Sequence, residues 1–155
     1  MVKIKLPKGL PSFSFRKDTV AKILNDMADT AVKTMVNETE QGKDIQGKNF
    51  TRLRASTVKS KREKGYRNPS KPLIATGLMK NIFKSKKATT QSLSSEVKVA
   101  KKRKDIAEYH IDGAGSLPKR VFFGVGKTLE GKLKKIIKLR LEKLIKVVFN
   151  KVRAK

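Results

Sequence analysis

The segment TVAKILNDMADTAVKTMVNETEQ, residues 19–41, carries apolar side chains at the three- and four-residue spacing of an amphipathic helix. Asp18 is its predicted N-cap, and Gly42 is its predicted stop because glycine adopts the left-handed conformation that ends many helices. The apolar stripe consists of Val20, Ile23, Leu24, Met27, Ala31 and Met35. Such a helix needs a partner to cover this stripe.

A second long amphipathic helix is predicted over residues 128–152. Its apolar face consists of Leu133, Ile136, Ile137, Leu141, Leu144, Ile145, Val148 and Val152. The basic residues Lys134, Lys138 and Lys146 are expected on the opposite side. The two helices are therefore expected to bury their stripes against other parts of one core.

The region between the two helices predicts a small antiparallel sheet. Residues 84–100 show the alternation of a β-hairpin, and Val121–Val125, after Pro118, predicts a further buried strand. One face of the hairpin would carry Leu93, Ser95, Val97 and Val99. The sequence therefore predicts an α+β fold in which a small antiparallel sheet packs against long N- and C-terminal helices.

The whole chain, residues 1–155, is predicted to form a single domain. Residues 1–17 are predicted to be an N-terminal arm, and residues 43–75 an extended basic loop with one short helix. Ser56 would cap this helix and Gly65 would end it. A loop of this length is uncommon in a compact domain, so we expect it to order on contact with a partner.

Two shorter helical segments are predicted around the hairpin. Thr76 can cap a helix that runs through Phe83, and residues 105–111 can form a helical turn. Residues 113–115, Gly-Ala-Gly, would then give a loop.

Composition narrows the function classes. The chain of 155 residues has no cysteine, which excludes disulfides, thiolate metal sites and cysteine nucleophiles and fits a reducing cytoplasm. No apolar run approaches the roughly 20 residues that span a bilayer, and the N-terminus lacks the pattern of a signal peptide. We therefore expect no membrane span.

Charge is large and unevenly distributed. The net charge is +26 at pH 7, which indicates a polyanionic or acidic partner. Residues 18–44 hold six acids and three lysines, a net of −3, whereas residues 127–155 hold eleven bases and two acids, a net of +9. The two long helices would either attract each other or present independently solvated faces.

No motif for catalysis, cofactor or metal is complete. Gly126-Lys127-Thr128 resembles the end of a phosphate-binding loop, but Val121 stands where that loop needs glycine. His110 has neither a nucleophile in a suitable context nor a second metal ligand, and it is predicted to be structural. The pair Glu108 and Asp112 more simply balances the nearby lysines. We therefore predict no enzymatic activity, no cofactor and no metal.

The basic C-terminal helix offers a second kind of contact. Lys134, Lys138 and Lys146 suit sequence-independent contact with DNA phosphates or with an acidic partner. A solvated face and a helix lying on a membrane surface are the other interpretations. Lysine dominates and aromatic residues are few, so base-specific or stacking recognition is not predicted.

Three ordered segments carry a family resemblance. They are FTRLRASTVKSK at residues 50–61, KPLIATGLMKNI at 71–82, and IAEYHIDG at 106–113 followed by LPKRVFFG at 117–124. In order and spacing they resemble the phage virion-morphogenesis family of Mu-like tail-completion and head–tail-joining proteins. The matching positions are Leu73, Thr76, Gly77, His110, Gly113, Pro118, Arg120, Phe122 and Gly124.

The resemblance implies a structural virion protein. It implies a homo-oligomeric ring, usually a hexamer, at the top of the tail, where the subunit joins the head connector or stopper to the tail tube. The protein would lie in the neck of the virion and in the host cytoplasm during assembly, and DNA would pass through the ring. The alternative, supported by the charge of +26, is a basic nucleic-acid-binding protein of the ribosomal or nucleoid type.

Overall fold

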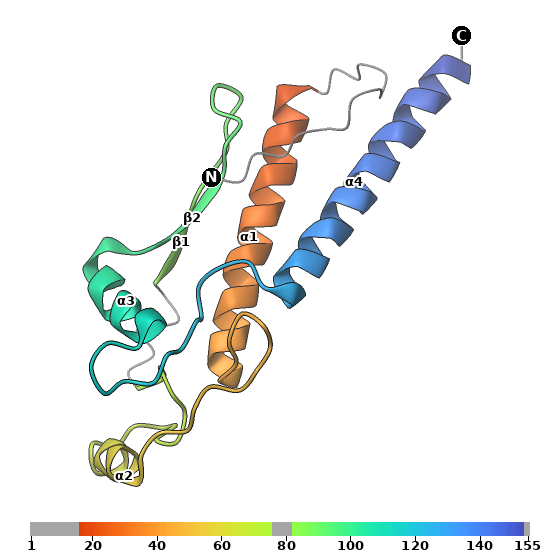
Figure 1. The fold of residues 1–155 in the computed structure, drawn as a ribbon. Helices are drawn as coiled ribbons and strands as arrows, with labels where there is room; N and C mark the ends of the chain where they lie inside the picture. The colour runs from red at the N-terminus through yellow and green to blue at the C-terminus, as the bar shows by residue number, and fades with distance from the viewer. Residues whose placement is uncertain (1–15, 76–81, 154–155) are drawn as a thin grey trace.

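A computed structural model describes the backbone of residues 16–75 and 82–153 and the side chains up to residue 147. The predicted α+β architecture is confirmed: the described residues form two long helices, a two-stranded antiparallel sheet and three short helical segments (Figure 1). The elements are α1 (Lys17–Gln41), α2 (Ala55–Glu63), β1 (Phe83–Lys86), β2 (Glu96–Val99), the 3-10 turn η2 (Lys101–Arg103), α3 (Lys104–Asp112) and α4 (Lys127–Arg153).

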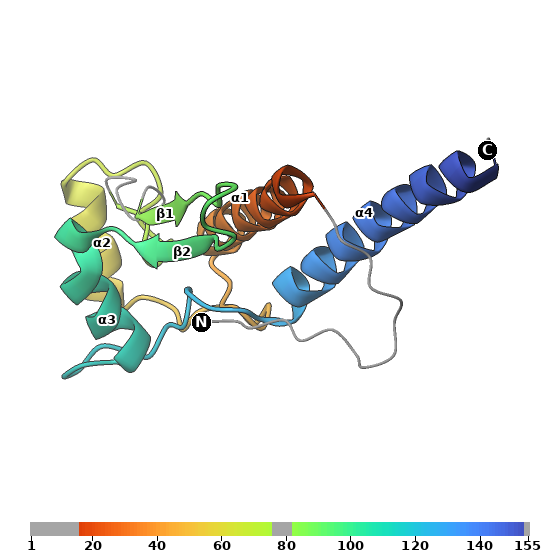
Figure 2. The same cartoon turned by 90° about the horizontal axis from the view of Figure 1, so that it is seen from above.

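The central element is α1, which lies between the hairpin on one side and α4 on the other (Figures 1 and 2). Because both sides are covered, the buried residues extend beyond the predicted stripe. They are Ala21, Ala28, Ala31, Thr34, Met35 and Thr39. Of the predicted stripe only Ala31 and Met35 are buried, while Val20, Ile23, Leu24 and Met27 are partly buried.

Both ends of α1 follow from local chemistry, and one differs from the prediction. Gly42 adopts the left-handed conformation, with a φ of 74°, and ends the helix as predicted. The predicted N-cap is wrong, because Arg16 occupies the cap position and Asp18 lies inside the first turn. There the Asp18 carboxylate lies 3.2 Å from Arg16 and also complements the helix dipole.

The helix α4 runs antiparallel to α1 and diverges from it toward the C-terminus (Figures 1 and 2). Its first turn contains buried Leu129, and its contacts with α1 include an ion pair between Arg140 and Asp26. Of the two alternatives left open by the charge distribution, attraction between the helices is represented by this one ion pair, whose side chains are about half exposed. Beyond these contacts, Ile145 and Val147 are 44% and 55% exposed.

The hairpin is confirmed, with Phe83 paired with Val99 and Lys86 paired with Glu96. Val97 and Val99 lie on one face, as predicted, and pack against the core. Leu93 lies in the loop between the two strands and is exposed. The predicted helix from Thr76 through Phe83 is wrong at Phe83. This residue belongs to β1, where it pairs with Val99 and its ring packs in the core. Residues 76–81, which make up most of that prediction, lie outside the described residues.

The predicted strand Val121–Val125 is also wrong. Among the described residues this segment pairs with no strand, and it bends at Phe123 and Gly124. The Ile45 amide donates a hydrogen bond of 3.0 Å to the Val121 carbonyl. Gly124, with a φ of 143°, breaks any regular strand. Phe122 nevertheless fills the core, as predicted.

The core lies where α1, the hairpin, α3 and the segment before α4 meet. The Phe83 ring stacks on Phe123 at 6.1 Å and meets Phe122 edge to face at 6.2 Å. The fully buried members are Ala31, Met35, Phe50, Ile82, Phe83, Ala107, Phe122 and Leu129.

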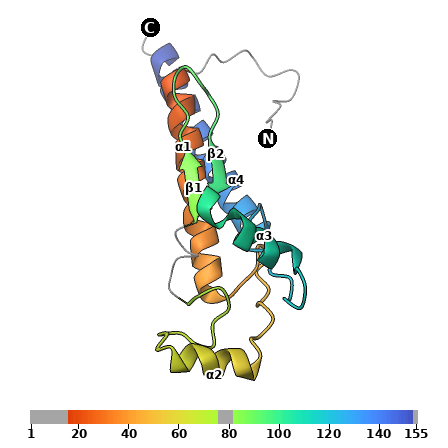
Figure 3. The ribbon, with the colours of Figure 1, turned by 90° about the vertical axis from the view of Figure 1, so that its left-hand side faces the viewer.

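The predicted loop 43–75 contains α2 and is tied together by its own hydrogen bonds. Lys61 Nζ donates to the carbonyls of Lys71 and Ile74, each at 2.7 Å, so the loop folds back onto α2. The helix starts at Ala55 rather than after a Ser56 cap, and it ends just before Gly65. It has no buried residue and lies crosswise at one end of the molecule (Figure 3).

Candidate functional site

A basic cleft opens between α2 and the segment that follows α3. It encloses about 540 Å³, and its walls come from three segments that are far apart in the sequence. The lining residues are Thr51, Arg52, Leu53, Arg54, Thr57, Leu73, His110, Gly115, Ser116, Leu117, Pro118 and Arg120. None of them is acidic, so the cleft has a strongly positive character.

The turn after α3 brings His110 and Arg120 together. Gly113 ends α3 with a φ of 75°, and a Cβ there would lie 3.1 Å from the backbone nitrogen of Lys119. The chain then folds back, and the Arg120 amide donates to the His110 carbonyl at 2.7 Å. Gly113 is therefore required both for its left-handed backbone and for this close approach.

Arg120 is a buried cation without a paired carboxylate. Its side chain is only 3% exposed, and its Nη2 donates to the Thr51 carbonyl at 3.3 Å. Its Nε is buried and has no acceptor among the described residues. Burial lowers the pKa of Arg120, but a guanidinium stays charged in proteins.

No acidic side chain in the described part of the chain supplies a counter-ion to Arg120. All 13 acidic side chains belong to the described part of the chain, and none of the ion pairs found there involves Arg120. Glu108, on α3, is exposed and pairs with Lys104 at 3.4 Å. The positive charge of Arg120 is therefore not balanced by a neighbouring carboxylate. Because the residue is buried, water solvates this charge poorly.

His110 is a neutral neighbour of this cation. Burial, and secondarily the charge of Arg120, lowers the pKa of the His110 imidazole below its ordinary value of 6.5. Its Nδ1 is buried and has no hydrogen-bond partner among the described residues. A neutral imidazole with a free ring nitrogen can donate to or accept from a ligand, depending on its tautomer.

The outer part of the cleft combines charge, hydroxyl groups and apolar surface. Arg52 and Arg54 are exposed, and Thr51, Thr57 and Ser116 add hydroxyl groups. The apolar wall consists of Leu53, Leu73, Leu117 and Pro118.

Leu73 has a φ of 60° and is the one non-glycine residue with a positive φ in the described part of the chain. Strained backbone of this kind is often found at binding sites.

Four of the residues singled out in the sequence meet in this cleft: Leu73, His110, Pro118 and Arg120. Gly113 shapes it, whereas Phe122 belongs to the core and Gly124 packs against Ile45. Thr76 and Gly77 lie outside the described residues. Sequence reasoning did not single out Arg52 and Arg54, although they lie in a resembling segment, because periodicity does not show which loop residues face a cleft.

The three lysines of α4 lie elsewhere. Lys134 pairs with Glu130 at 2.6 Å, so part of its charge is neutralised. Lys138 and Lys146 are exposed and have no ion pair among the residues described. They form a separate basic surface.

Gly126 explains why the Gly-Lys-Thr motif is not a phosphate-binding loop. A Cβ there would lie 1.5 Å from the Ile45 carbonyl oxygen, so the backbone of Ile45 fills the space beside it. Within residues 16–75 and 82–153, no group of three or more histidine, aspartate or glutamate side chains is arranged to hold a metal ion.

No family model matches this chain, and no curated protein or solved structure is significantly similar to it. Among the described residues, no helix is both long enough and apolar enough to cross a membrane.

Proposed function

We propose that the chain is a structural subunit of a tailed bacteriophage, a tail-completion or head–tail-joining protein. It assembles as a ring, a hexamer in the simplest case, at the top of the tail and joins the tail tube to the head connector. In this proposal it acts in the virion neck, reaches it from the host cytoplasm, and performs no catalysis.

One observation carries the proposal. The three segments that resemble the virion-morphogenesis family all contribute to one cleft, through Thr51–Arg54, Leu73 and His110–Arg120. The three segments, although far apart in the chain, therefore share one surface. A shared docking surface is consistent with an assembly role, because its arginine, hydroxyl and apolar side chains can supply charge, hydrogen bonds and packing contacts to a partner.

The exposed apolar residues Ile145 and Val147 of α4 support self-assembly. Ile145 and Val147 are exposed, and both are large apolar residues on a helix that has diverged from α1. In a ring, such a helix end would pack against the neighbouring subunit and lose this contact with water.

A second candidate function, nonspecific binding of nucleic acid, is favoured by the lysines of α4. Lys138 and Lys146 have no ion pair in the described structure, and the net charge is +26. Contact of this kind is sequence-independent and weakens steeply with salt. A ring subunit would use it weakly, along the DNA path, whereas a nucleoid-type protein would bind tightly as a monomer.

The discriminating experiment measures mass and DNA binding on the same preparation. Native mass spectrometry over a concentration series should detect closed oligomers, and Val147→Glu should shift them toward monomer. The matched control is Lys146→Gln, which removes a neighbouring charge; it should leave the oligomers intact and lower DNA retention at low salt. A strictly monomeric chain that binds DNA tightly would refute the ring and favour the second candidate.

A further inference from the structure

The buried charge of Arg120 has no carboxylate partner in the described structure. Arg120 is only 3% exposed, and its Nε has no acceptor among the described residues. The side-chain hydrogen bond found there goes from its Nη2 to the neutral carbonyl of Thr51. Buried charges in proteins are normally paired, because the interior does not solvate them. Since none of the acidic side chains of the described residues pairs with Arg120, an acidic group of a partner molecule is the natural counter-ion.

The surroundings of Arg120 specify the kind of group that fits. Arg52, Arg54 and the hydroxyl groups of Thr57 and Ser116 line the same cleft. A planar guanidinium binds a planar carboxylate through two parallel hydrogen bonds, and hydroxyl groups can donate to the same oxygens. The neutral imidazole of His110 is a further possible donor.

We propose that this cleft receives an acidic segment of a partner protein, with a carboxylate of that segment paired to the Arg120 guanidinium. Arg52 and Arg54 attract neighbouring acids at the rim. The apolar wall of Leu53, Leu73 and Leu117 packs against the aliphatic part of the same segment. The inference rests on the proposed assembly function for its biological setting, but not for its chemistry.

The geometry favours a protein carboxylate over the phosphates of nucleic acid. Phosphate backbones are bound by exposed lysine and arginine side chains along an open face, which describes Lys138 and Lys146 on α4. Arg120 is instead recessed in a cleft of about 540 Å³ with a partly apolar wall. That volume suits a few side chains and is too small for a duplex.

The chain contains its own reporter, because His110 is the single histidine of the sequence. Its imidazole resonances can be followed by NMR without ambiguity. Adding a hexaglutamate peptide should shift them saturably. The same peptide should raise the pKa of His110, because a carboxylate beside Arg120 offsets the repulsion that disfavours the imidazolium.

Variants separate the cleft from general attraction to a basic protein. Arg120→Lys keeps the charge but loses the planar group that makes two parallel hydrogen bonds. It should weaken peptide binding at least about tenfold. Because a buried substitution can unfold the chain, Arg52→Gln and Arg54→Gln at the exposed rim test the same site. Lys138→Gln is the matched control: it removes an equal charge far from the cleft and should change binding little.

Several outcomes would overturn the inference. They are unmoved His110 resonances, equal losses for Lys138→Gln and the rim variants, or a hexaglutamine peptide that binds as well. A DNA duplex that moves His110 more strongly than the acidic peptide would make the cleft a phosphate site and refute an acidic protein partner. Ring formation is measured separately, so a monomeric chain that still binds the peptide in the cleft would refute the proposed function alone.

Discussion

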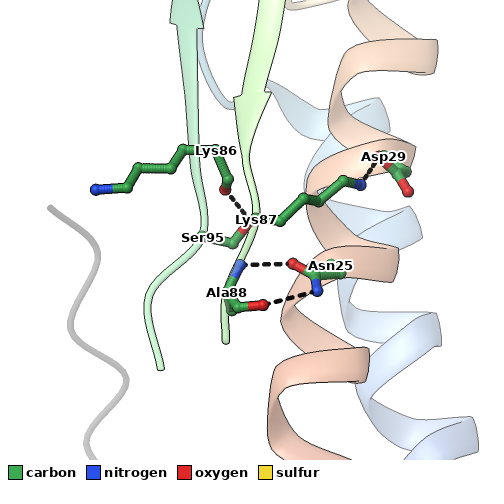
Figure 4. Close-up of polar contacts among 6 residues, drawn as sticks. All are labelled: Asn25, Asp29, Lys86, Lys87, Ala88 and Ser95. Atoms are coloured by element: carbon green, nitrogen blue, oxygen red, sulfur yellow. Dashed lines mark hydrogen bonds and ion pairs between the residues drawn. The ribbon is translucent and has the colours of Figure 1, made fainter. Parts of the chain in front are cut away.

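The carboxamide of Asn25 forms two hydrogen bonds with the backbone of one residue, Ala88, at the end of β1 (Figure 4). Its Nδ2 donates to the Ala88 carbonyl at 3.1 Å, and its Oδ1 accepts from the Ala88 amide at 2.7 Å. The side chain thus satisfies both backbone polar groups of Ala88, two residues after β1 ends at Lys86. Together with the ion pair between Lys87 and Asp29, it holds the hairpin on α1.

Replacing Asn25 with alanine should therefore loosen the hairpin. Two hydrogen bonds to a buried backbone residue would be lost, at a cost of about 2 kcal/mol in the free energy of unfolding. Urea denaturation followed by circular dichroism measures this change. Asn37→Ala, at an exposed position of the same helix, should stay within about 0.5 kcal/mol of the parent. Equal effects at the two positions would contradict the assigned role of Asn25.

The glycines on either side of the start of α4 should respond in opposite directions to alanine. At Gly126 a Cβ would overlap the Ile45 carbonyl oxygen, so Gly126→Ala should destabilise the fold by about 3 kcal/mol. At Gly131 nothing lies within 4 Å of the added Cβ, and alanine favours the helix interior by about 1 kcal/mol. Thermal and urea unfolding of both variants check the pair, and a tolerated alanine at Gly126 would show that the contact with Ile45 is not tight.

His110 should make the stability depend on pH. Its folded-state pKa is lowered by burial and by Arg120, so the unfolded chain binds the proton more readily. Stability should therefore fall as the pH drops through the ordinary value of 6.5, and this loss should level off below the folded-state pKa. Urea midpoints across this range measure the effect. His110→Asn should flatten the profile, and an unchanged slope would assign it to other groups.

The ion pair between Asp26 and Arg140 should contribute little to stability. Both side chains are about half exposed, so water and salt screen their attraction. A double-mutant cycle with Asp26→Asn and Arg140→Gln should give a coupling of at most about 1 kcal/mol, smaller in high salt. A parallel cycle with Lys138→Gln should show no coupling to Asp26. A large, salt-independent coupling would mean that this charge pair is a main determinant of how α1 and α4 pack.

Features encoded within one short segment could be predicted from the residues alone. Both long helices, the hairpin, the stop at Gly42 and the loop that starts at Gly113 belong to this class. The reason is that spacing of apolar residues, alternation and the left-handed tolerance of glycine act over a few neighbouring residues. Net charge left two alternatives for the long helices, mutual attraction or independently solvated faces, and it did not indicate the pairing of Asp26 with Arg140.

Features that depend on distant partners were decided by the tertiary structure. Val121–Val125 could have been a strand, but no strand of the described residues pairs with it. Phe83 lies in β1, where its ring packs against Phe122 and Phe123. The unpaired state of Arg120 is of the same kind, since the carboxylate it lacks could have come from anywhere in the chain. Local sequence sets which conformations are open to a segment, and only the packed chain settles which groups find a partner.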